Sequence, residues 1–233
     1  MRNFFITGTD TDAGKTFVTC ALLQAFAMRG LVAAPMKPIA AGTININGVQ
    51  MNADVVALRE VSATNASLAD LNPYCFRAPI APHLAAVQEN VVVDMEVIRA
   101  AFDRLSVGAD AVLVEGAGGF LVPLSATQSM AEIPSALSLE VILVVVMRLG
   151  VLNHALLTVE AIRARGLTLS GWIANIPVAG ETMQALEENI AALATMIAAP
   201  LLGIVPHDNQ SDGVIARAQR TARILDIESL LHK

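Results

Sequence analysis

Short apolar runs alternate along the chain with longer stretches in which apolar residues recur at helical spacing. The runs lack the polar alternation of a half-exposed strand, which indicates strands covered by helices on both faces. Strands are predicted at FFIT, VAAPMKP, AVLVEGAGG, VILVVVM, LSGWIANIP and LLGIVP. Helices are predicted at residues 16–29, 53–61, 153–165, 182–197 and 214–225. We therefore expect an α/β fold with a doubly wound, mostly parallel sheet and helices on both of its faces.

The segments between these elements carry few domain-boundary signals. Residues 43–52 and 65–83 are polar or rich in proline, and they are interpreted as loops suited to wall or cover a substrate site. No linker or charge run divides the 233 residues, so a single P-loop-like α/β domain over 1–233 is expected. Ligands of such sheets bind beyond the carboxyl ends of the strands, which is where the polar candidates fall.

The first predicted strand runs directly into the glycine-containing segment GTDTDAGKT, and a helix follows. Backbone N–H groups at such a helix start cradle phosphate, with Lys15 suited to reach the β- and γ-phosphates and Thr16 to hold Mg2+. Thr9 stands where the usual pattern has its first glycine, because Gly8 lies one residue earlier. A β–α turn with a chance Gly-Lys-Thr is the alternative, and the strand–loop–helix context favours the phosphate site.

A second lysine is expected at the same edge of the sheet. Lys37 ends the second predicted strand within Pro35-Met36-Lys37-Pro38, where the flanking prolines restrict the backbone to an extended segment. Two lysines, Lys15 and Lys37, that converge on one crevice indicate anionic groups or a transferring phosphoryl. A solvated lysine at the end of a strand is the alternative.

Two carboxylates are candidates for a metal site. Glu115 ends an apolar strand and is followed by glycines that allow close approach of a ligand. Asp54 opens a predicted helix, and taken alone it is more typical of a helix-start acid than of a ligand. Together with the Thr16 hydroxyl, these carboxylates supply the hard oxygens that Mg2+ prefers, with water and phosphate oxygens completing the shell.

Composition narrows the class of partner. Only 15% of the residues are charged and 55% are hydrophobic, against a usual charged share of about 25%, so surface buried between subunits of a homo-oligomer is expected. The net charge of -6 excludes a general attraction to nucleic acid or anionic lipid. The apolar run from Val141 to Met147 is too short to span a membrane. Cys20 and Cys75 fit reduced thiols, and the N-terminus lacks a signal peptide, so a cytoplasmic protein with small-molecule substrates is expected.

Several sequence blocks, taken in order, resemble the dethiobiotin synthetase family. They are GTDTDAGKT, KPIAAG, NPYCFRAPIAPH, VEGAGGFLVPLS, VILVVVMRLGVLNHALLTVEAIRARGL, GWIAN and PLLGIVP, and they extend from residue 5 to about residue 206. The last 25 or so residues match less clearly. The resemblance implies a cyclo-ligase that uses ATP, Mg2+ and CO2 to convert 7,8-diaminopelargonic acid into dethiobiotin, ADP and phosphate. The implied route passes through a carbamate and a carbamic-phosphoric anhydride.

The resemblance also implies site residues and a homodimer. Lys15 and Lys37 are the implied catalytic residues. The implied nucleotide site, Mg2+ ligands included, comprises Asp12, Ala13, Gly14, Lys15, Thr16, Phe17, Asp54, Glu115, Gly116, Ala117, Gly118, Asn175, Ile176, Ile204, Val205 and Pro206. The implied substrate contacts are Thr11, Lys37, Ala41, Leu149, Gly150, Val151 and Asn153, with the last four supplied across a subunit interface. Ala41 stands where many members of the family have Ser, so one hydrogen bond to the diamine is expected to be missing, unless Thr43 or a backbone group replaces it.

Two other readings of the motifs remain open from the sequence. An ATP-driven switch of the chromosome-partitioning type shares the fold and a glycine-rich loop, but it has a further lysine early in that loop, where this chain has Asp10 and Thr11. An amide ligase of cobalamin synthesis normally requires a glutaminase domain, for which 233 residues leave no room.

Overall fold

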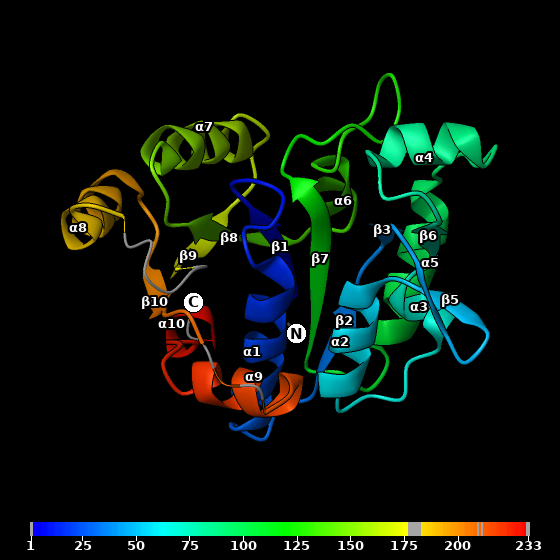
Figure 1. Ribbon diagram of the computed structural model, residues 1–233, viewed down its shortest axis with the longest axis horizontal. Helices are drawn as coiled ribbons and strands as arrows, with labels where there is room; N and C mark the ends of the chain where they lie inside the picture. The colour runs from blue at the N-terminus through cyan, green and yellow to red at the C-terminus, as the bar shows by residue number, and fades with distance from the viewer. Residues whose placement is uncertain (1, 177–182, 209, 211, 232–233) are drawn as a thin grey trace.

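A parallel sheet forms the centre of the protein. The computed structural model describes residues 2–176, 183–208, 210 and 212–231. The main sheet has six strands in the order β10-β9-β8-β1-β7-β2, and every neighbouring pair is parallel (Figure 1). The strands are β1 (Phe4–Gly8), β2 (Ala33–Met36), β7 (Ala111–Gly119), β8 (Glu140–Val146), β9 (Leu169–Asn175) and β10 (Leu201–Val205). The predicted fold class is confirmed.

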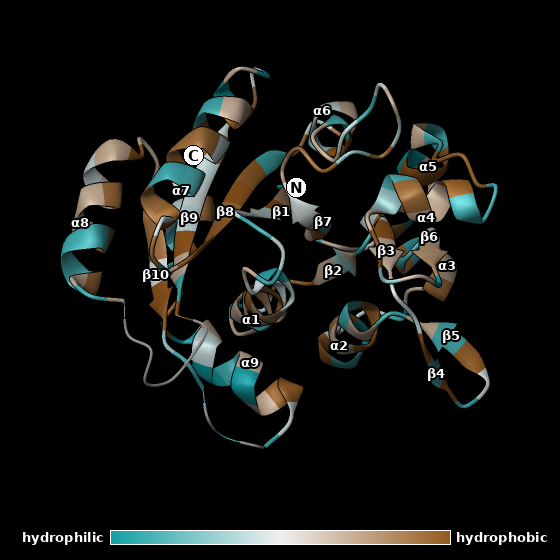
Figure 2. Cartoon of the chain, turned by 45° about the horizontal axis from the view of Figure 1, so that its top comes forward, coloured by the Kyte–Doolittle hydropathy of each residue, from teal (hydrophilic) through white to brown (hydrophobic). Residues whose placement is uncertain are grey.

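Helices cover both faces of this sheet. One face, with Phe4 and Ile6 of β1, packs against α1 (Lys15–Ala27), α2 (Ala53–Val61), α9 (Val214–Ala222) and α10 (Glu228–Leu231). The other face, with Phe5, packs against α4 (Pro82–Gln88), α5 (Met95–Ser106) and α6 (Glu132–Ala136), and farther along against α7 (Val151–Arg163) and α8 (Leu186–Met196). Because both faces of the central strands are buried, apolar residues predominate in them, as Figure 2 shows for most of β8. No helix in the described part of the chain is long and apolar enough to cross a membrane.

The segments between β2 and β7 contain more structure than the sequence analysis predicts. The strands β3 (Ile39–Ala41) and β6 (Tyr74–Phe76) pair in parallel, and α3 (Leu68–Leu71) lies between them in sequence. The strands β4 (Ile44–Ile46) and β5 (Val49–Met51) form a hairpin within residues 43–52, so the prediction of a loop there is wrong. The connecting Asn47 and Gly48 both have positive φ, as an Asn-Gly hairpin turn requires.

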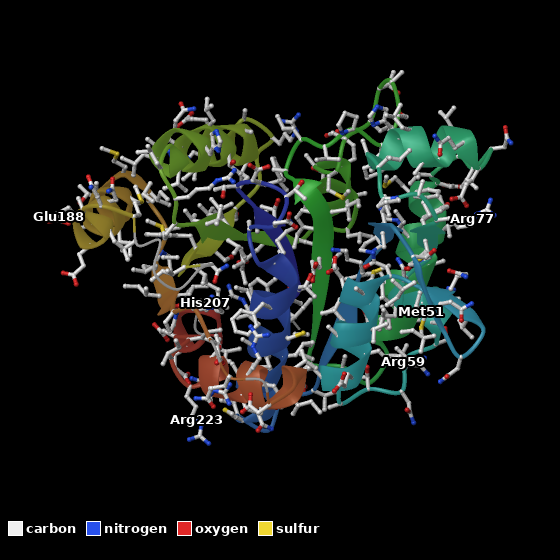
Figure 3. The ribbon with its side chains drawn as sticks, in the orientation of Figure 1. Met51, Arg59, Arg77, Glu188, His207 and Arg223 are labelled. Atoms are coloured by element: carbon white, nitrogen blue, oxygen red, sulfur yellow. The ribbon has the colours of Figure 1, made fainter. Side chains whose placement is uncertain are left out.

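The helix α5 also lies outside the predicted elements. Asp94 caps it by accepting a hydrogen bond from the Glu96 amide, and four of its apolar side chains face the core. Charged side chains on the periphery point away from the sheet, as Figure 3 shows for Arg77, Glu188 and Arg223. Several buried polar groups lie elsewhere, at the carboxyl edge of the sheet.

The tight packing around β7 yields a stability prediction. A methyl group added at Gly116 would lie 2.8 Å from Cζ of the buried Phe5 and 3.4 Å from Cγ of Met130. We expect Gly116→Ala to lower the free energy of unfolding by about 1–3 kcal/mol, because overpacked cores must shift their neighbours. Gly119→Ala is the matched control in the same strand, since its added methyl meets nothing closer than 3.9 Å. Equal urea midpoints for the two variants would contradict this account.

Candidate active site

The loop between β1 and α1 has the backbone shape of a phosphate cradle. Gly14 has φ 88° and is the N-cap of α1, and Asp12 also has a positive φ, 57°. A Cβ at Gly14 would lie 2.1 Å from Nδ2 of Asn175, so only glycine fits this position. The same Nδ2 donates to the Ala13 carbonyl at 2.9 Å. The end of β9 therefore fixes the loop at the start of α1, where helix N–H groups favour an anion.

Lys15 enters the site as the first residue of α1. Its side chain is buried, and Nζ donates to the Asp10 carbonyl at 3.1 Å. Burial, followed by the nearby charge of Lys37, lowers the pKa of Lys15 to about 8. The Asp10 carboxylate forms an ion pair with Arg148 and accepts a hydrogen bond from the Thr11 amide at 2.8 Å. These contacts hold its negative charge away from the phosphate cradle.

A buried ion cluster lies beside the loop. Nζ of Lys37 donates to Oε1 of Glu115 at 2.5 Å and lies 2.9 Å from Oδ2 of Asp54. The Thr16 hydroxyl donates to the same Oε1 of Glu115 at 2.7 Å. Lys37 is 3% exposed and Glu115 is 0% exposed. Four residues that the sequence analysis selected separately are thus in direct contact: Lys37 follows β2, Glu115 lies inside β7, and Thr16 and Asp54 lie in the first turns of α1 and α2.

The opposite charges of the cluster stabilise the ionised forms of Lys37 and Asp54. Burial alone would lower the pKa of Lys37, but Glu115 and Asp54 outweigh it, and the Lys37 pKa is raised. Burial alone would raise the pKa of Asp54, but Lys37 outweighs it, and the Asp54 pKa is lowered. At neutral pH, Lys37 is therefore an ammonium and Asp54 a carboxylate.

The backbone of Lys37 is held from both sides by residues that the sequence analysis did not select. The Lys37 amide donates to the Leu71 carbonyl at 2.7 Å. The buried side chain of Asn72 donates through Nδ2 to the Lys37 carbonyl at 2.6 Å and to the Tyr74 carbonyl at 3.1 Å. A similar role falls to Asn52, which caps α2 and donates to the Ala41 and Gly42 carbonyls. Asn52 and Asn72 could have been selected from the sequence because each is a side-chain amide at the end of a polar segment.

A cavity of about 810 Å³ opens over the loop and the cluster. Most of the residues that line it were selected from the sequence: Thr11, Asp12, Gly14, Lys15, Thr16, Phe17, Lys37, Ala41, Asp54, Ala117 and Gly118. The others are Ala40, Asn52, Pro79, Ile80, Ala81, Pro82 and Val122. The proline-containing part of the segment 65–83 thus forms one wall, in agreement with its predicted use. Thr43, considered as a replacement for the missing serine hydroxyl, is not among the lining residues.

The remaining selected residues lie outside the lining of this cavity. Ala13, Glu115 and Gly116 are buried beneath it. Ile176 follows β9 and donates its amide to the Val205 carbonyl at 2.9 Å, so Asn175, Ile176, Ile204, Val205 and Pro206 form one pair of adjacent strand ends.

The selected residues that follow β8 also lie outside the lining of the cavity. Gly150, with φ 90°, is the N-cap of α7, and Leu149 beside it is 93% exposed. Asn153 lies exposed in the first turn of α7 rather than at its cap. Asn153 therefore does not cap the helix.

Comparison with known proteins agrees with this geometry. A family model described as an AAA domain matches residues 2–214. The chain is 53% identical over 206 residues to ATP-dependent dethiobiotin synthetase BioD of Aromatoleum aromaticum, covering 88% of this chain and 91% of the relative. It is 48% identical over 231 residues to the protein of the same name from Cellvibrio japonicus, covering 99% and 98%. The chain belongs to the ATP-dependent dethiobiotin synthetase family. The resemblance carried by the sequence motifs, and with it the expectation of an ATP-using ligase, is confirmed.

Solved structures share this fold. The MinC:MinD cell division protein complex of Aquifex aeolicus aligns with a TM-score of 0.55 at 16% identity, covering 97% of this chain and 88% of that chain. The signal recognition particle receptor FtsY of Elizabethkingia anophelis aligns with a TM-score of 0.51 at 16% identity, covering 95% and 65%. At these identities the likeness concerns the fold alone. The dethiobiotin synthetase relatives, not MinD, define the family, and the chromosome-partitioning switch is not favoured.

The lowered pKa of Lys15 yields a pH prediction. The pKa of Lys15 in the protein without nucleotide is about 8, so Lys15 loses its proton as the pH rises through this value. If Lys15 binds phosphate, ATP affinity falls above this pH, by up to about tenfold per pH unit, because only the ammonium form binds well. The measurement is the Kd of a fluorescent ATP analogue between pH 7 and 9.5. Lys15→Met is the control and should bind more weakly, with a flat profile over this range. A wild-type profile as flat as that of the variant would rule out the role.

Proposed function

We propose that the protein is a dethiobiotin synthetase that closes a urea ring on 7,8-diaminopelargonic acid with CO2 and ATP. The observation that supports this most directly is the convergence of Lys15 and Lys37 on one cavity that also holds the phosphate-binding loop. Cations held at one crevice stabilise the charge that develops when a nucleotide reacts with a small anion. The names of the relatives, ATP-dependent dethiobiotin synthetase, agree with this assignment.

The proposed chemistry has three steps. One amine of the substrate forms a C–N bond to CO2 and loses a proton, which gives a carbamate. A carbamate oxygen then attacks the γ-phosphorus of ATP, ADP leaves, and a carbamic-phosphoric anhydride forms. The second amine attacks the carbonyl carbon, phosphate leaves, and a proton is released as the cyclic urea closes. Each step needs positioning and charge neutralisation more than covalent help from the protein.

The residues of the cavity are assigned to these steps as follows. The backbone of residues 12–17 cradles the phosphates, and Lys15 neutralises the β- and γ-phosphates. Lys37 neutralises the carbamate and the phosphoryl group in transit, which makes Lys15 and Lys37 the proposed catalytic pair. Thr11 and Ala41 also line this cavity and are assigned to the diamine.

Mg2+ is the proposed metal cofactor, and the residues present fit it. The Thr16 hydroxyl and the carboxylates of Asp54 and Glu115 are oxygen donors of the kind that Mg2+ binds. Oε2 of Glu115 is buried without a hydrogen-bond partner among the described residues. Bound there, Mg2+ would neutralise charge on the phosphate oxygens. Among the described residues no group of three or more His, Cys, Asp or Glu side chains could hold a metal, so hydroxyl, water and phosphate oxygens complete the proposed shell.

The proposed base site lies at the ends of β9 and β10. Asn175, Ile176, Ile204, Val205 and Pro206 form adjacent strand ends beside the loop, within reach of Gly14 through Asn175. Because the Asn175 amide nitrogen already donates to Ala13, the carbonyl oxygen of Asn175 is the atom suited to accept from the exocyclic amine of adenine.

A homodimer with shared sites completes the proposal, with residues 1–233 acting as one domain in each subunit. Leu149 and Leu157 are strongly exposed on and beside α7, which fits a surface covered by a second copy. We assign Leu149, Gly150, Val151 and Asn153 to the substrate site of the partner.

ATP as co-substrate and the free thiols of Cys20 and Cys75 favour a cytoplasmic location for the protein.

The direct test is formation of dethiobiotin by the purified chain. The protein is incubated with MgATP, bicarbonate and 7,8-diaminopelargonic acid, and the product is identified by mass spectrometry. We expect product from the wild type and at least about 10²-fold lower kcat from Lys15→Met, because a preorganised charge acts mainly in the transition state. ATP hydrolysis that DNA or lipid stimulates, with no response to the diamine, would refute the assignment.

Subunit mixing tests the shared site. Lys37→Met and Asn153→Ala damage different halves of each proposed site, so a hybrid dimer has one intact site and one doubly damaged site. Random reassociation makes half of the dimers hybrid, so mixing should restore roughly a quarter of wild-type activity. Differently tagged chains confirm that exchange occurred. Activity equal to the average of the two parents after confirmed exchange would exclude a site built from two chains.

A further inference from the structure

The cluster around Lys37 contains a conflict between two proposed roles. Lys37 is to supply a positive charge to substrate groups in the cavity, while Asp54 and Glu115 are to hold a divalent cation. In the structure these groups bind one another: Nζ of Lys37 lies 2.5 Å from Oε1 of Glu115 and 2.9 Å from Oδ2 of Asp54. An ammonium between two carboxylates at these distances is already neutralised, so it offers little charge to a substrate.

The conflict is one of space as well as charge. Oxygen atoms that bind Mg2+ lie about 2.0–2.1 Å from it, closer than any hydrogen-bond donor approaches. Oδ2 of Asp54, the part of the cluster that opens to the cavity, is in contact with Nζ of Lys37. A divalent ion at this carboxylate and an ammonium on the same oxygen would be two cations in contact, which is unfavourable.

We propose that the Lys37 ammonium is the resident cation of the metal site in the free protein, and that a divalent cation binds by displacing it. Lys37 then becomes an uncompensated charge in the cavity only after the cation has taken its carboxylates. The displacement itself concerns this chain and a metal ion; the catalytic use of the released charge rests on the proposed function.

The contacts of Lys37 confine the exchange to its side chain. Its amide and carbonyl are bonded to Leu71 and Asn72, and Pro38 follows, so the backbone is fixed. The side chain, by contrast, borders the cavity of about 810 Å³, which gives the ammonium a place to go. Four rotatable bonds of the lysine side chain suffice for such a movement, whereas Glu115, inside β7, has no comparable freedom.

The composition of the chain makes this movement directly observable. The sequence contains three lysines, Lys15, Lys37 and Lys233. The wild-type protein labelled with ¹³C at lysine Cε therefore gives three side-chain NMR signals, which Lys15→Met and Lys37→Met assign. Mg2+ alone is titrated in, without nucleotide or substrate, against Na+ at matched ionic strength. We expect the Lys37 signal to shift saturably toward the position of a solvated lysine. A Lys37 signal that does not respond saturably to Mg2+ overturns the proposal.

A binding measurement on variants tests the competition from the metal side. Mn2+ affinity, again without nucleotide, is measured by the electron paramagnetic resonance of free Mn2+ at pH 7, where Lys15 and Lys37 are both ammonium groups. We expect Lys37→Met to bind Mn2+ at least about tenfold more tightly than the wild type, because the competing cation is gone. Lys15→Met is the matched control: it removes the same charge from the same cavity but vacates no carboxylate, and it should change the affinity by less than about threefold.

The remaining outcomes are decisive in either direction. Equal gains in the two variants would mean that general electrostatics, not occupancy, governs the metal site, and would overturn the proposal. If Lys37→Met does not fold, Lys15→Met and Lys233→Met assign the Lys37 signal by elimination, and the lysine NMR titration of the wild type decides alone. Neither measurement contains substrate or nucleotide, so displacement of Lys37 without formation of dethiobiotin in the turnover assay would refute the proposed function and leave the exchange standing.

Discussion

The contact between Lys37 and the fully buried Glu115 is the constraint on which the rest of the site depends. A carboxylate with 0% exposure inside a sheet is very costly unless a cation and hydrogen bonds compensate it. Here one ammonium and the Thr16 hydroxyl meet the same oxygen. In the free protein this arrangement holds the start of α1 against the end of β2 and the interior of β7, so the backbones of the phosphate loop and of Lys37 are kept beside each other.

The order of the strands makes this contact possible. β1 and β2 both pair with β7, so the residues that follow β1 and β2 lie on either side of the Glu115 strand. Glu115 lies opposite Ile6 in the interior of β7, where both faces are covered, and its carboxylate can therefore reach only neighbours from within the fold. Asp54 approaches from the first turn of α2, which Asn52 caps and ties to the end of β3. A phosphate site and a cation site then share one edge of the sheet.

Local features of the sequence predicted much of this. The alternation of apolar runs and helical stretches predicted the six strands of the main sheet, because strands buried on both faces leave an uninterrupted apolar signal. The segment GTDTDAGKT predicted the cradle, and the position of Lys37 after the second strand predicted a second lysine at the same site. The hairpin at Asn47-Gly48 and the helix α5 were missed although local signals, an Asn-Gly turn and an Asp94 cap, were present.

Other features depend on the tertiary fold and had no local signal. That Lys37 pairs with Glu115, 78 positions away, follows from strand order, which the pattern does not encode. The burial that lowers the pKa of Lys15 and the clamp of Asn72 on Lys37 likewise exist only once β2, α3 and β7 have assembled. The sequence could therefore name the members of the cluster but not the bonds among them.

A double-mutant cycle between Lys37 and Glu115, measured by urea unfolding, tests the central claim most directly. Each single change, Lys37→Met or Glu115→Leu, leaves a buried charge without its partner and should cost about 3–5 kcal/mol of stability. The double variant removes both charges and should cost less than the larger of the two single changes, because similar-sized apolar side chains replace the pair. Single costs that add to within about 0.5 kcal/mol in the double variant would contradict the claim, since independent residues behave in that way.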